Sequence, residues 1–317
     1  MAEMTGSYNQ LKTRLLIGLA INAVIILAEF LGGYLINSMA LMGDAGHNLI
    51  DQGSLFLALY AHILAARPAT EERTFGYHRA GIVSAFINGF VLLLTAGVLA
   101  AVAIYRLTSP VMVPGGWMII IALVSFLANL SVAWLLQHGA KDDLNIRGAF
   151  WHMLADAWVS LGVVICGMGI MYTGWTVLDP LISLAIVVVI AKGAWPIFKE
   201  SLEVLLESTP PTVNTKQIVE SIERIQGVNN VHDLHVWAVE PRLIMLTCHV
   251  LVDSNHEREK DSLLRTIQSM MTSEFGIGHH TIQLEMECTE SNIVHCDLNR
   301  FTHGEVNPTF SHSHSSH

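Results

Sequence analysis

The sequence predicts a helical membrane protein in which six transmembrane helices are followed by a small cytoplasmic α+β domain. Two observations carry this prediction. Only 14% of the 317 residues are charged and 52% are hydrophobic, with a mean hydropathy of +0.47, whereas soluble domains carry about 25% charged residues. The charge is also uneven: residues 1–200 hold 11 acidic and 10 basic residues, a net of −1, and residues 201–317 hold 16 and 7, a net of −9. The total of −10 argues against a nucleic-acid partner.

Six apolar stretches reach the length of about 20 residues that a membrane-spanning helix needs. They cover residues 15–36, 38–66, 80–107, 116–138, 148–172 and 178–198. Lys and Arg gather in the connections on one side of the predicted membrane, which places both termini in the cytoplasm. The first stretch lacks a clear cleavage site, so we expect it to be retained as a span and not removed as a signal peptide. Residues 1–14 then form a short cytoplasmic segment, and residues 15–200 form the six-helix domain.

The pattern changes after residue 200. Residues 215–225 and 257–275 have helical periodicity, whereas residues 228–239, 243–252 and 281–288 alternate like strands. The order αββαβ is typical of a small sandwich of ferredoxin-like type. We therefore predict a cytoplasmic domain over residues 201–288 and a His-containing tail over residues 289–317.

The pattern His-x-Leu-x-Asp occurs in both the second and the fifth predicted span. His47 and Asp51 form one copy, and His152 and Asp156 form the other. Residues four apart share a helix face, and ionisable side chains inside a membrane are costly enough to indicate function. If the two helices face each other, two imidazoles and two carboxylates converge, a set of ligands suited to tetrahedral Zn²⁺. A structural His–Asp hydrogen bond and a proton relay without metal are the alternatives.

The types of ligand narrow the choice of metal and suggest a mechanism. Imidazole with carboxylate suits Zn²⁺, Co²⁺ and Cd²⁺, while the motifs offer neither the thiolate that favours Cu(I) nor the all-oxygen cage that favours Mg²⁺ or Ca²⁺. Since metal binding requires neutral His and ionised Asp, protons and metal compete. A site that opens alternately to each side would exchange cytoplasmic metal for external protons. Asp44, on the same helix face as His47, is expected to support a ligand or to accept a proton.

On these residues the chain resembles the cation diffusion facilitator family over nearly its whole length. The resemblance rests on the six spans and four motifs: Asp44-Ala-Gly-His47-x-x-x-Asp51, His152-x-x-x-Asp156, Arg73-Thr-Phe-Gly-Tyr-His78-Arg79 and Val231-His232-Asp-Leu-His235-Val-Trp237. The chain is similar to the bacterial zinc, cadmium and cobalt exporters of that family. The resemblance implies a homodimeric metal/proton antiporter of the cytoplasmic (inner) membrane that prefers zinc. It also implies that His47, Asp51, His152 and Asp156 form the transport site.

The resemblance implies metal sites outside the membrane as well. Family members bind metal in the cytoplasmic domain at the dimer interface, and the matching positions are His232, His249 and Glu285, with His279 as a fourth ligand. Zn²⁺ bound there would offset the repulsion between two acidic domains. His78 matches a position that binds a peripheral metal in some members, and a phosphate-facing or structural role is the alternative.

The tail holds further potential ligands. Cys288, His295 and Cys296 would be reduced in the cytoplasm and are candidates for a Cys/His site. The remaining histidines of the tail either collect metal or are simply solvated.

Two functions of other classes compete with transport. An intramembrane metal-dependent hydrolase needs an open zinc position and a general base, as in His-Glu-x-x-His, and the sequence contains no such motif. A membrane-anchored metal sensor would not require ligands inside two of its spans. We therefore expect a transporter and not an enzyme.

Overall fold

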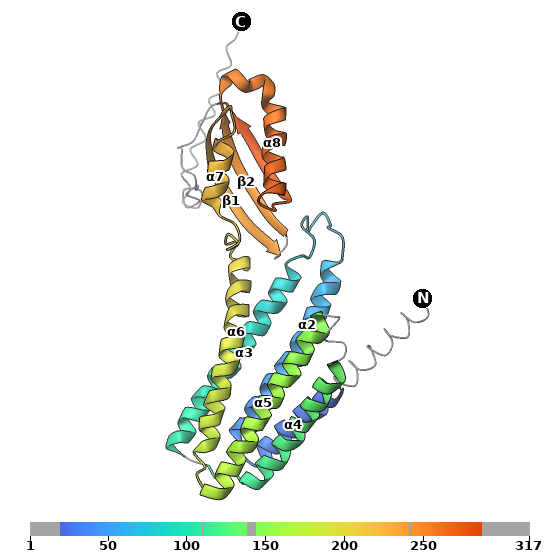
Figure 1. Ribbon diagram of the computed structural model, residues 1–317, viewed down its shortest axis with the longest axis vertical. Helices are drawn as coiled ribbons and strands as arrows, with labels where there is room; N and C mark the ends of the chain where they lie inside the picture. The colour runs from blue at the N-terminus through green and yellow to red at the C-terminus, as the bar shows by residue number, and fades with distance from the viewer. Residues whose placement is uncertain (1–19, 110, 138–143, 241–242, 287–317) are drawn as a thin grey trace, which may run out of the picture. The chain divides into compact units, whose positions relative to one another are not determined.

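The computed structural model describes residues 20–109, 111–137, 144–240 and 243–286, and it divides into two compact units between Leu202 and Glu203. The first unit is helical (Figure 1). Within the described residues its first helix covers Ala20–Leu35. The helices that follow are α2 (Met39–Ala65), α3 (Ala80–Thr108), α4 (Gly115–Leu136), α5 (Leu144–Thr173) and α6 (Leu178–Leu205).

Four of the described helices are long and apolar enough to cross a membrane, namely α3, α4, α5 from Phe150 onward, and α6. The first helix is apolar but shorter within the described residues. Helix α2 has 27 residues but carries Asp44, His47 and Asp51, which lower its hydropathy. The six predicted spans therefore correspond to six helices, and the predicted fold class is confirmed.

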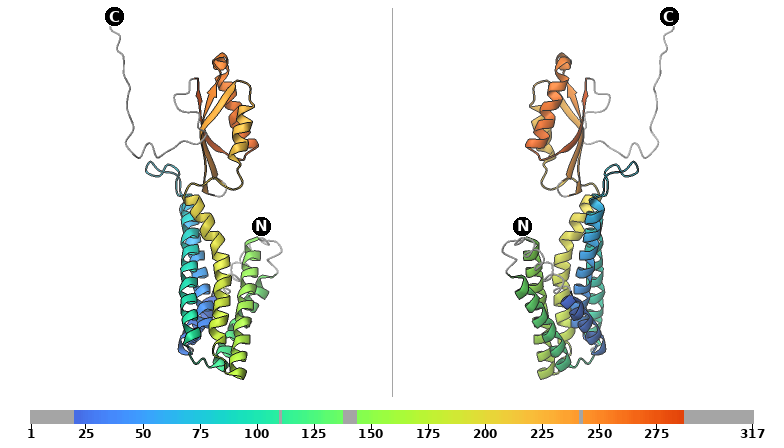
Figure 2. Two further views of the ribbon diagram at one scale, coloured as in Figure 1. Left: turned by 90° about the vertical axis from the view of Figure 1, so that its left-hand side faces the viewer. Right: turned by 90° about the vertical axis from the view of Figure 1, so that its right-hand side faces the viewer.

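Small residues allow α4 and α5 to lie side by side along their length (Figure 2). A Cβ atom built on Gly115 would lie only 2.5 Å from the carbonyl oxygen of Gly167, so only glycine fits at this crossing. Close backbone approach at small residues is a common means of packing helices in membranes. The side chains of Leu41, Met118 and Val163 are fully buried between the helices.

A carboxylate of α6 holds the beginning of α2. Asp179, which is fully buried, accepts hydrogen bonds from the Ser38 hydroxyl (2.7 Å) and from the backbone N–H groups of Met39 (2.9 Å) and Ala40 (3.2 Å). The Arg106 guanidinium of α3 lies 4.0 Å from the same carboxylate and donates to the carbonyl oxygen of Asn37. These bonds satisfy N–H groups that a helix leaves unpaired at its first turn. They join α2, α3 and α6 at one end of the unit.

The second unit has the predicted αββαβ order. It contains α7 (Thr215–Glu223), β1 (Val228–Glu240), β2 (Leu243–Val252), the 3₁₀ turn η2 (Ser254–Glu259), α8 (Lys260–Ser273) and β3 (His279–Glu285). The sheet order is β1-β2-β3, with β1 antiparallel and β3 parallel to β2. Both helices cover one face of the sheet (Figure 2).

The core of this unit is formed by the alternating apolar residues of the strands and one face of each helix. Ile218 and Ile222 of α7 and Ile267 and Met271 of α8 are fully buried against the strands. The opposite face of the sheet carries polar residues of all three strands together with a few apolar ones. Alternation along a strand thus places histidines and carboxylates of neighbouring strands on one face.

The ladder between β1 and β2 is irregular at one point that matters for the site. His232 pairs with His249 and His235 pairs with Thr247, so β1 has one residue more than β2 in this interval. This is a β-bulge, which bends a strand and redirects side chains. Asp233 lies within it at a φ of 50°, a left-handed conformation that aspartate tolerates better than most residues.

Candidate functional site

The two His-x-Leu-x-Asp motifs lie on α2 and α5. One helical turn brings His47 Nε2 to 3.5 Å from Asp51 Oδ2 on α2, and the equivalent distance from His152 to Asp156 on α5 is 3.6 Å. The two helices also meet at this level, because His152 Nε2 lies 3.4 Å from Asp51 Oδ2. The rings of His47 and His152 are 6.4 Å apart in an edge-on arrangement. All four residues therefore form one chain of contacts in which Asp51 joins the helices.

Three N···O distances within this cluster are longer than hydrogen bonds and close to those between metal ligands, although among the described residues the ligand atoms of the four side chains do not all lie within 4.8 Å of one another. They all exceed the range of about 2.7–3.2 Å that is usual for N–H···O bonds. Tetrahedral zinc with ligand distances of about 2.0–2.1 Å requires neighbouring ligand atoms about 3.3 Å apart. The measured separations of 3.4 to 3.6 Å are close to that value.

The cluster is partly accessible at one end and buried at the other. The side chain of His152 is 40% exposed, whereas that of Asp156 is 4% exposed. Asp156 Oδ2 and His47 Nδ1 are buried and have no hydrogen-bond partner among the described residues. Buried polar atoms normally have a partner, so we expect a further polar group or ion to contact these two atoms.

Asp44 lies in a separate polar layer next to this cluster. Its carboxylate accepts a hydrogen bond from Ser160 Oγ of α5 at 3.2 Å, and Asn48 Nδ2 lies 3.5 Å away. Ser160 in turn lies 3.4 Å from Ser125 of α4. Asp44 thus links three helices through hydroxyl groups, and its hydrogen bonds go to Ser160 and Asn48 and not to one of the four cluster residues.

A second cluster lies in the other unit, on the face of the sheet opposite its two helices. His232 of β1 and His249 of β2 are directly paired, with rings 5.4 Å apart. Glu285 of β3 bridges them, because its Oε2 lies 3.2 Å from His232 Nε2 and its Oε1 lies 3.0 Å from His249 Nδ1. One ligand atom from each of the three residues lies within 4.8 Å of the others, an arrangement that can hold a metal ion.

The immediate surroundings also fit a cation. His232 Nδ1 is buried without a hydrogen-bond partner among the described residues. Gln283 donates a 2.8 Å hydrogen bond to Glu285 Oε1 and so orients the carboxylate. Groups that orient ligands in this way contribute strongly to metal affinity.

Asp233 lies beside this cluster, although the sequence did not single it out. Its Oδ2 lies 3.8 Å from His249 Nε2, and its Oδ1 lies 3.1 Å from His235 Nε2. In a regular strand Asp233, which follows His232, would lie on the face opposite His249, and the bulge removes that constraint. The only signal in the sequence was an aspartate between two histidines, which does not reveal a bulge.

Other predicted residues lie elsewhere. His279 begins β3 opposite Met245, whereas Glu285 lies opposite Leu251. Six residues of strand separate them, about 20 Å, so the structure of one chain does not bring His279 to the cluster. His78 lies in the connection between α2 and α3, and Cys288, His295 and Cys296 lie outside the described residues.

The thiol of Cys248 is not a ligand in this arrangement. It lies on β2 next to His249 but points into the core, where it is 1% exposed. Burial, together with the nearby negative charge of Asp233, raises the pKa of the Cys248 thiol to about 12. Only a thiolate binds metal or reacts readily, so this group is inert near neutral pH.

Comparison with known protein families covers both units. Residues 15–206 match the cation efflux transmembrane domain, and residues 210–287 match the cytoplasmic domain of cation efflux proteins. The helical unit is therefore a multi-pass membrane domain, and the C-terminal unit is cytoplasmic.

Individual relatives match over most of their length. The chain is 37% identical over 275 residues to a cadmium, cobalt and zinc/H(+)-K(+) antiporter of Bacillus subtilis, covering 86% of this chain and 88% of the relative. It is 37% identical over 306 residues to the zinc transporter ZitB of Escherichia coli, covering 96% and 94%. It is 35% identical over 270 residues to the metal cation efflux system protein CzcD of Cupriavidus metallidurans, covering 85% of each. The chain belongs to the cation efflux family and is a membrane transporter of divalent cations, not an enzyme.

Proposed function

We propose that this protein exports Zn²⁺ from the cytoplasm in exchange for protons, with Cd²⁺ and Co²⁺ as further substrates. The transport site consists of His47, Asp51, His152 and Asp156. The names of the relatives support this choice of ions, since they refer to zinc, cadmium, cobalt and protons. The observation that carries the proposal is the 3.4 Å contact of Asp51 with His152, because it joins ligands of α2 and α5 in one cluster.

The chemistry of the four side chains supports the choice of metal. Two imidazoles and two carboxylates fill a tetrahedral shell around Zn²⁺ and leave no open position for catalysis. Two negative charges balance the divalent ion. The same set accommodates Co²⁺ and Cd²⁺, which prefer similar borderline ligands.

Coupling to protons follows from the same residues. The metal binds neutral imidazole and ionised carboxylate, so protonation releases it and metal binding releases protons. Histidine changes its charge near neutral pH. When the site opens to the external side, protons displace the metal, and the protonated site returns to the cytoplasmic side by alternating access.

The cytoplasmic unit binds a second class of Zn²⁺, held by His232, His249 and Glu285. Residues 201–317 carry a net charge of −9, so two copies repel each other, and bound cations would reduce that repulsion. We propose that the protein acts as a homodimer in the cytoplasmic (inner) membrane and that metal in the cytoplasmic units tightens the pair.

The test is transport by the full-length protein in liposomes with a zinc-sensitive dye inside. Zinc uptake should depend on an imposed pH gradient, and Asp51→Asn should reduce it by about 100-fold or more because a ligand and its charge are lost. Asp261→Asn is the matched control, since it removes an exposed carboxylate of α8. Uptake by Asp51→Asn at the wild-type rate would contradict the site, and uptake that ignores the pH gradient would contradict the coupling.

A further inference from the structure

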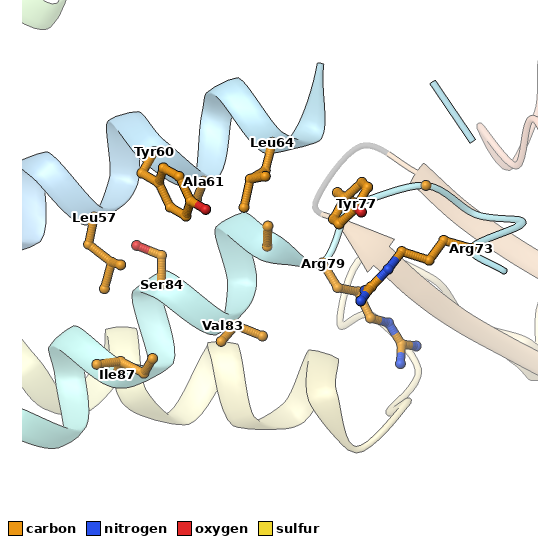
Figure 3. Close-up of a pocket in the computed structure, with 12 residues that line it drawn as sticks. Leu57, Tyr60, Ala61, Leu64, Arg73, Tyr77, Arg79, Val83, Ser84 and Ile87 are labelled. Atoms are coloured by element: carbon orange, nitrogen blue, oxygen red, sulfur yellow. The ribbon is translucent and has the colours of Figure 1, made fainter. Parts of the chain in front are cut away.

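A cavity of about 310 Å³ lies between the second half of α2 and the beginning of α3, and the transport site does not use it (Figure 3). It is lined by Leu57, Tyr60, Ala61, Leu64, Arg73, Gly76, Tyr77, Arg79, Ala80, Val83, Ser84 and Ile87. All of these residues belong to the membrane unit.

Most of the cavity wall is apolar and faces the lipid. Ala61 and Ser84 form its buried floor, at 3% and 5% exposure. Tyr60, Val83 and Ile87 at its rim are 59%, 42% and 42% exposed. In a membrane domain such surfaces contact lipid tails, so the groove is open to the hydrocarbon and not to bulk water.

Basic side chains gather at one end of the cavity. Arg73 and Arg79 line it, and none of the twelve lining residues is acidic. The guanidinium of Arg73 lies 4.7 Å above the ring of Tyr77. Helix α3 begins here without an acidic residue in its first turn, so the positive end of its dipole adds to the same potential.

This charged end lies at the cytoplasmic surface of the membrane. Helix α6 leads into the cytoplasmic unit, and the helices cross the membrane alternately, so the connection between α2 and α3 is cytoplasmic. The connection holds a defined shape around Arg73. Thr70 and Arg73 exchange two backbone hydrogen bonds of 3.1 Å, and Gly76 N–H donates to the Arg73 carbonyl at 2.8 Å. Gly76 has a φ of +64°, which glycine adopts without strain.

We propose that this cavity binds an anionic phospholipid of the cytoplasmic leaflet. One acyl chain lies in the apolar groove, and the phosphate lies between Arg73 and Arg79. Guanidinium groups bind phosphate through two parallel hydrogen bonds, and basic pockets between transmembrane helices on the cytoplasmic side are suited to anionic head groups. Tyr60 and Tyr77 also line the cavity, and aromatic side chains of this kind are favoured at the interface between head groups and lipid tails.

A lipid in this cavity would contact α2, the helix that carries His47 and Asp51. Leu57 follows Asp51 by six residues, about 9 Å along the helix. A lipid that packs against both α2 and α3 stabilises one arrangement of the two helices. Its binding is nevertheless independent of metal, so it can be measured without reference to transport.

The experiment uses the full-length protein purified in detergent and mixed with equal amounts of dioleoyl phosphatidylglycerol and dioleoyl phosphatidylcholine. Retained lipid is counted by native mass spectrometry. Two arginines near an anionic head group predict a preference for phosphatidylglycerol of about 30-fold. Arg73→Gln/Arg79→Gln should remove that preference. Arg67→Gln/Arg224→Gln is the control for charge, because it removes two arginines that do not line the cavity and should leave the preference intact.

A second variant tests the groove itself. Val83→Trp fills the exposed rim without changing any charge, so both lipids should be retained less. It also keeps the test valid if the double arginine variant does not fold, which the elution profile would show. Inorganic phosphate in excess should not displace the lipid, because it cannot use the groove. Equal retention of the two lipids by the wild type, or an unchanged preference after Arg73→Gln/Arg79→Gln, would overturn the proposal, as would complete displacement by inorganic phosphate.

Discussion

Replacing Asp179 by alanine is expected to lower the unfolding temperature of the membrane unit markedly. The buried carboxylate accepts three hydrogen bonds at the beginning of α2 and lies 4.0 Å from Arg106. After the change, the hydroxyl of Ser38 and two backbone N–H groups lose their acceptor. Arg106, only 16% exposed, loses its counter-charge.

The size of the effect follows from these contacts. Hydrogen bonds to charged groups are each worth about 1.5–3 kcal/mol, but losses within one network do not add. Breaking a buried ion pair from one side costs about 3–5 kcal/mol. We therefore expect Asp179→Ala to cost about 4 kcal/mol. Asp179→Asn, which keeps one acceptor oxygen, should cost about half as much. For a unit of this size, about 4 kcal/mol corresponds to about 10 °C.

The assay is thermal unfolding of the full-length protein in detergent, followed by tryptophan fluorescence. Six of the seven tryptophans lie in the membrane unit, so the signal reports on that unit. Asp253→Ala is the matched control, because Asp253 caps η2 of the cytoplasmic unit from a more exposed position. A midpoint for Asp179→Ala within about 2 °C of the wild type, less than about 1 kcal/mol, would refute the reasoning.

Three further predictions concern other parts of the chain. Gly167→Val should destabilise the membrane unit, because a Cβ there would lie 2.9 Å from a side chain of α4, whereas Gly162→Val, with no atom within 4 Å, should be tolerated; thermal midpoints distinguish the two. Glu285→Gln should remove metal from the cytoplasmic unit, and Glu223→Gln, an exposed residue of α7, should not, as measured by metal content after dialysis. Cys248 should resist alkylation at pH 8 in the folded protein, as peptide mapping would show. Burial raises the pKa of the Cys248 thiol to about 12, above its value of about 8.5 in the unfolded chain. The stability that the thiol contributes is therefore present below about pH 8.5 and is lost as the pH rises towards 12. A free energy of unfolding that rises over this interval would contradict the prediction.

Periodicity was sufficient to predict the elements of both units. Apolar stretches longer than about 20 residues have few alternatives to a membrane helix. The alternating residues 228–239 and 243–252 predicted β1 and β2 to within a residue, because side chains of a half-buried strand must alternate. The end of α8 and the ends of β3 differ by two or three residues from the prediction, since such boundaries depend on local hydrogen bonds.

Local spacing also predicted the two His–Asp contacts within the helices. A separation of four residues places His47 beside Asp51, and His152 beside Asp156, whatever the rest of the fold. The contact between Asp51 and His152 depends on how α2 and α5 pack, and no spacing in the sequence specifies that packing. From the sequence this contact was a hypothesis that required the two helices to face each other. The structure shows it, with Asp51 Oδ2 3.4 Å from His152 Nε2.

By itself, then, the sequence determined the class of fold, the order of the elements and the His–Asp pairs of the candidate site, because each depends on neighbours within one helix or strand. The tertiary structure decided what depends on residues far apart in the chain. Asp179 meets Ser38 across 141 positions, and the bulge at Asp233 turns a carboxylate towards His249. The parallel register of β3 brings Glu285, and not His279, to the two histidines. The lipid-facing cavity likewise exists only because α2 and α3 pack with Arg73 and Arg79 at one end.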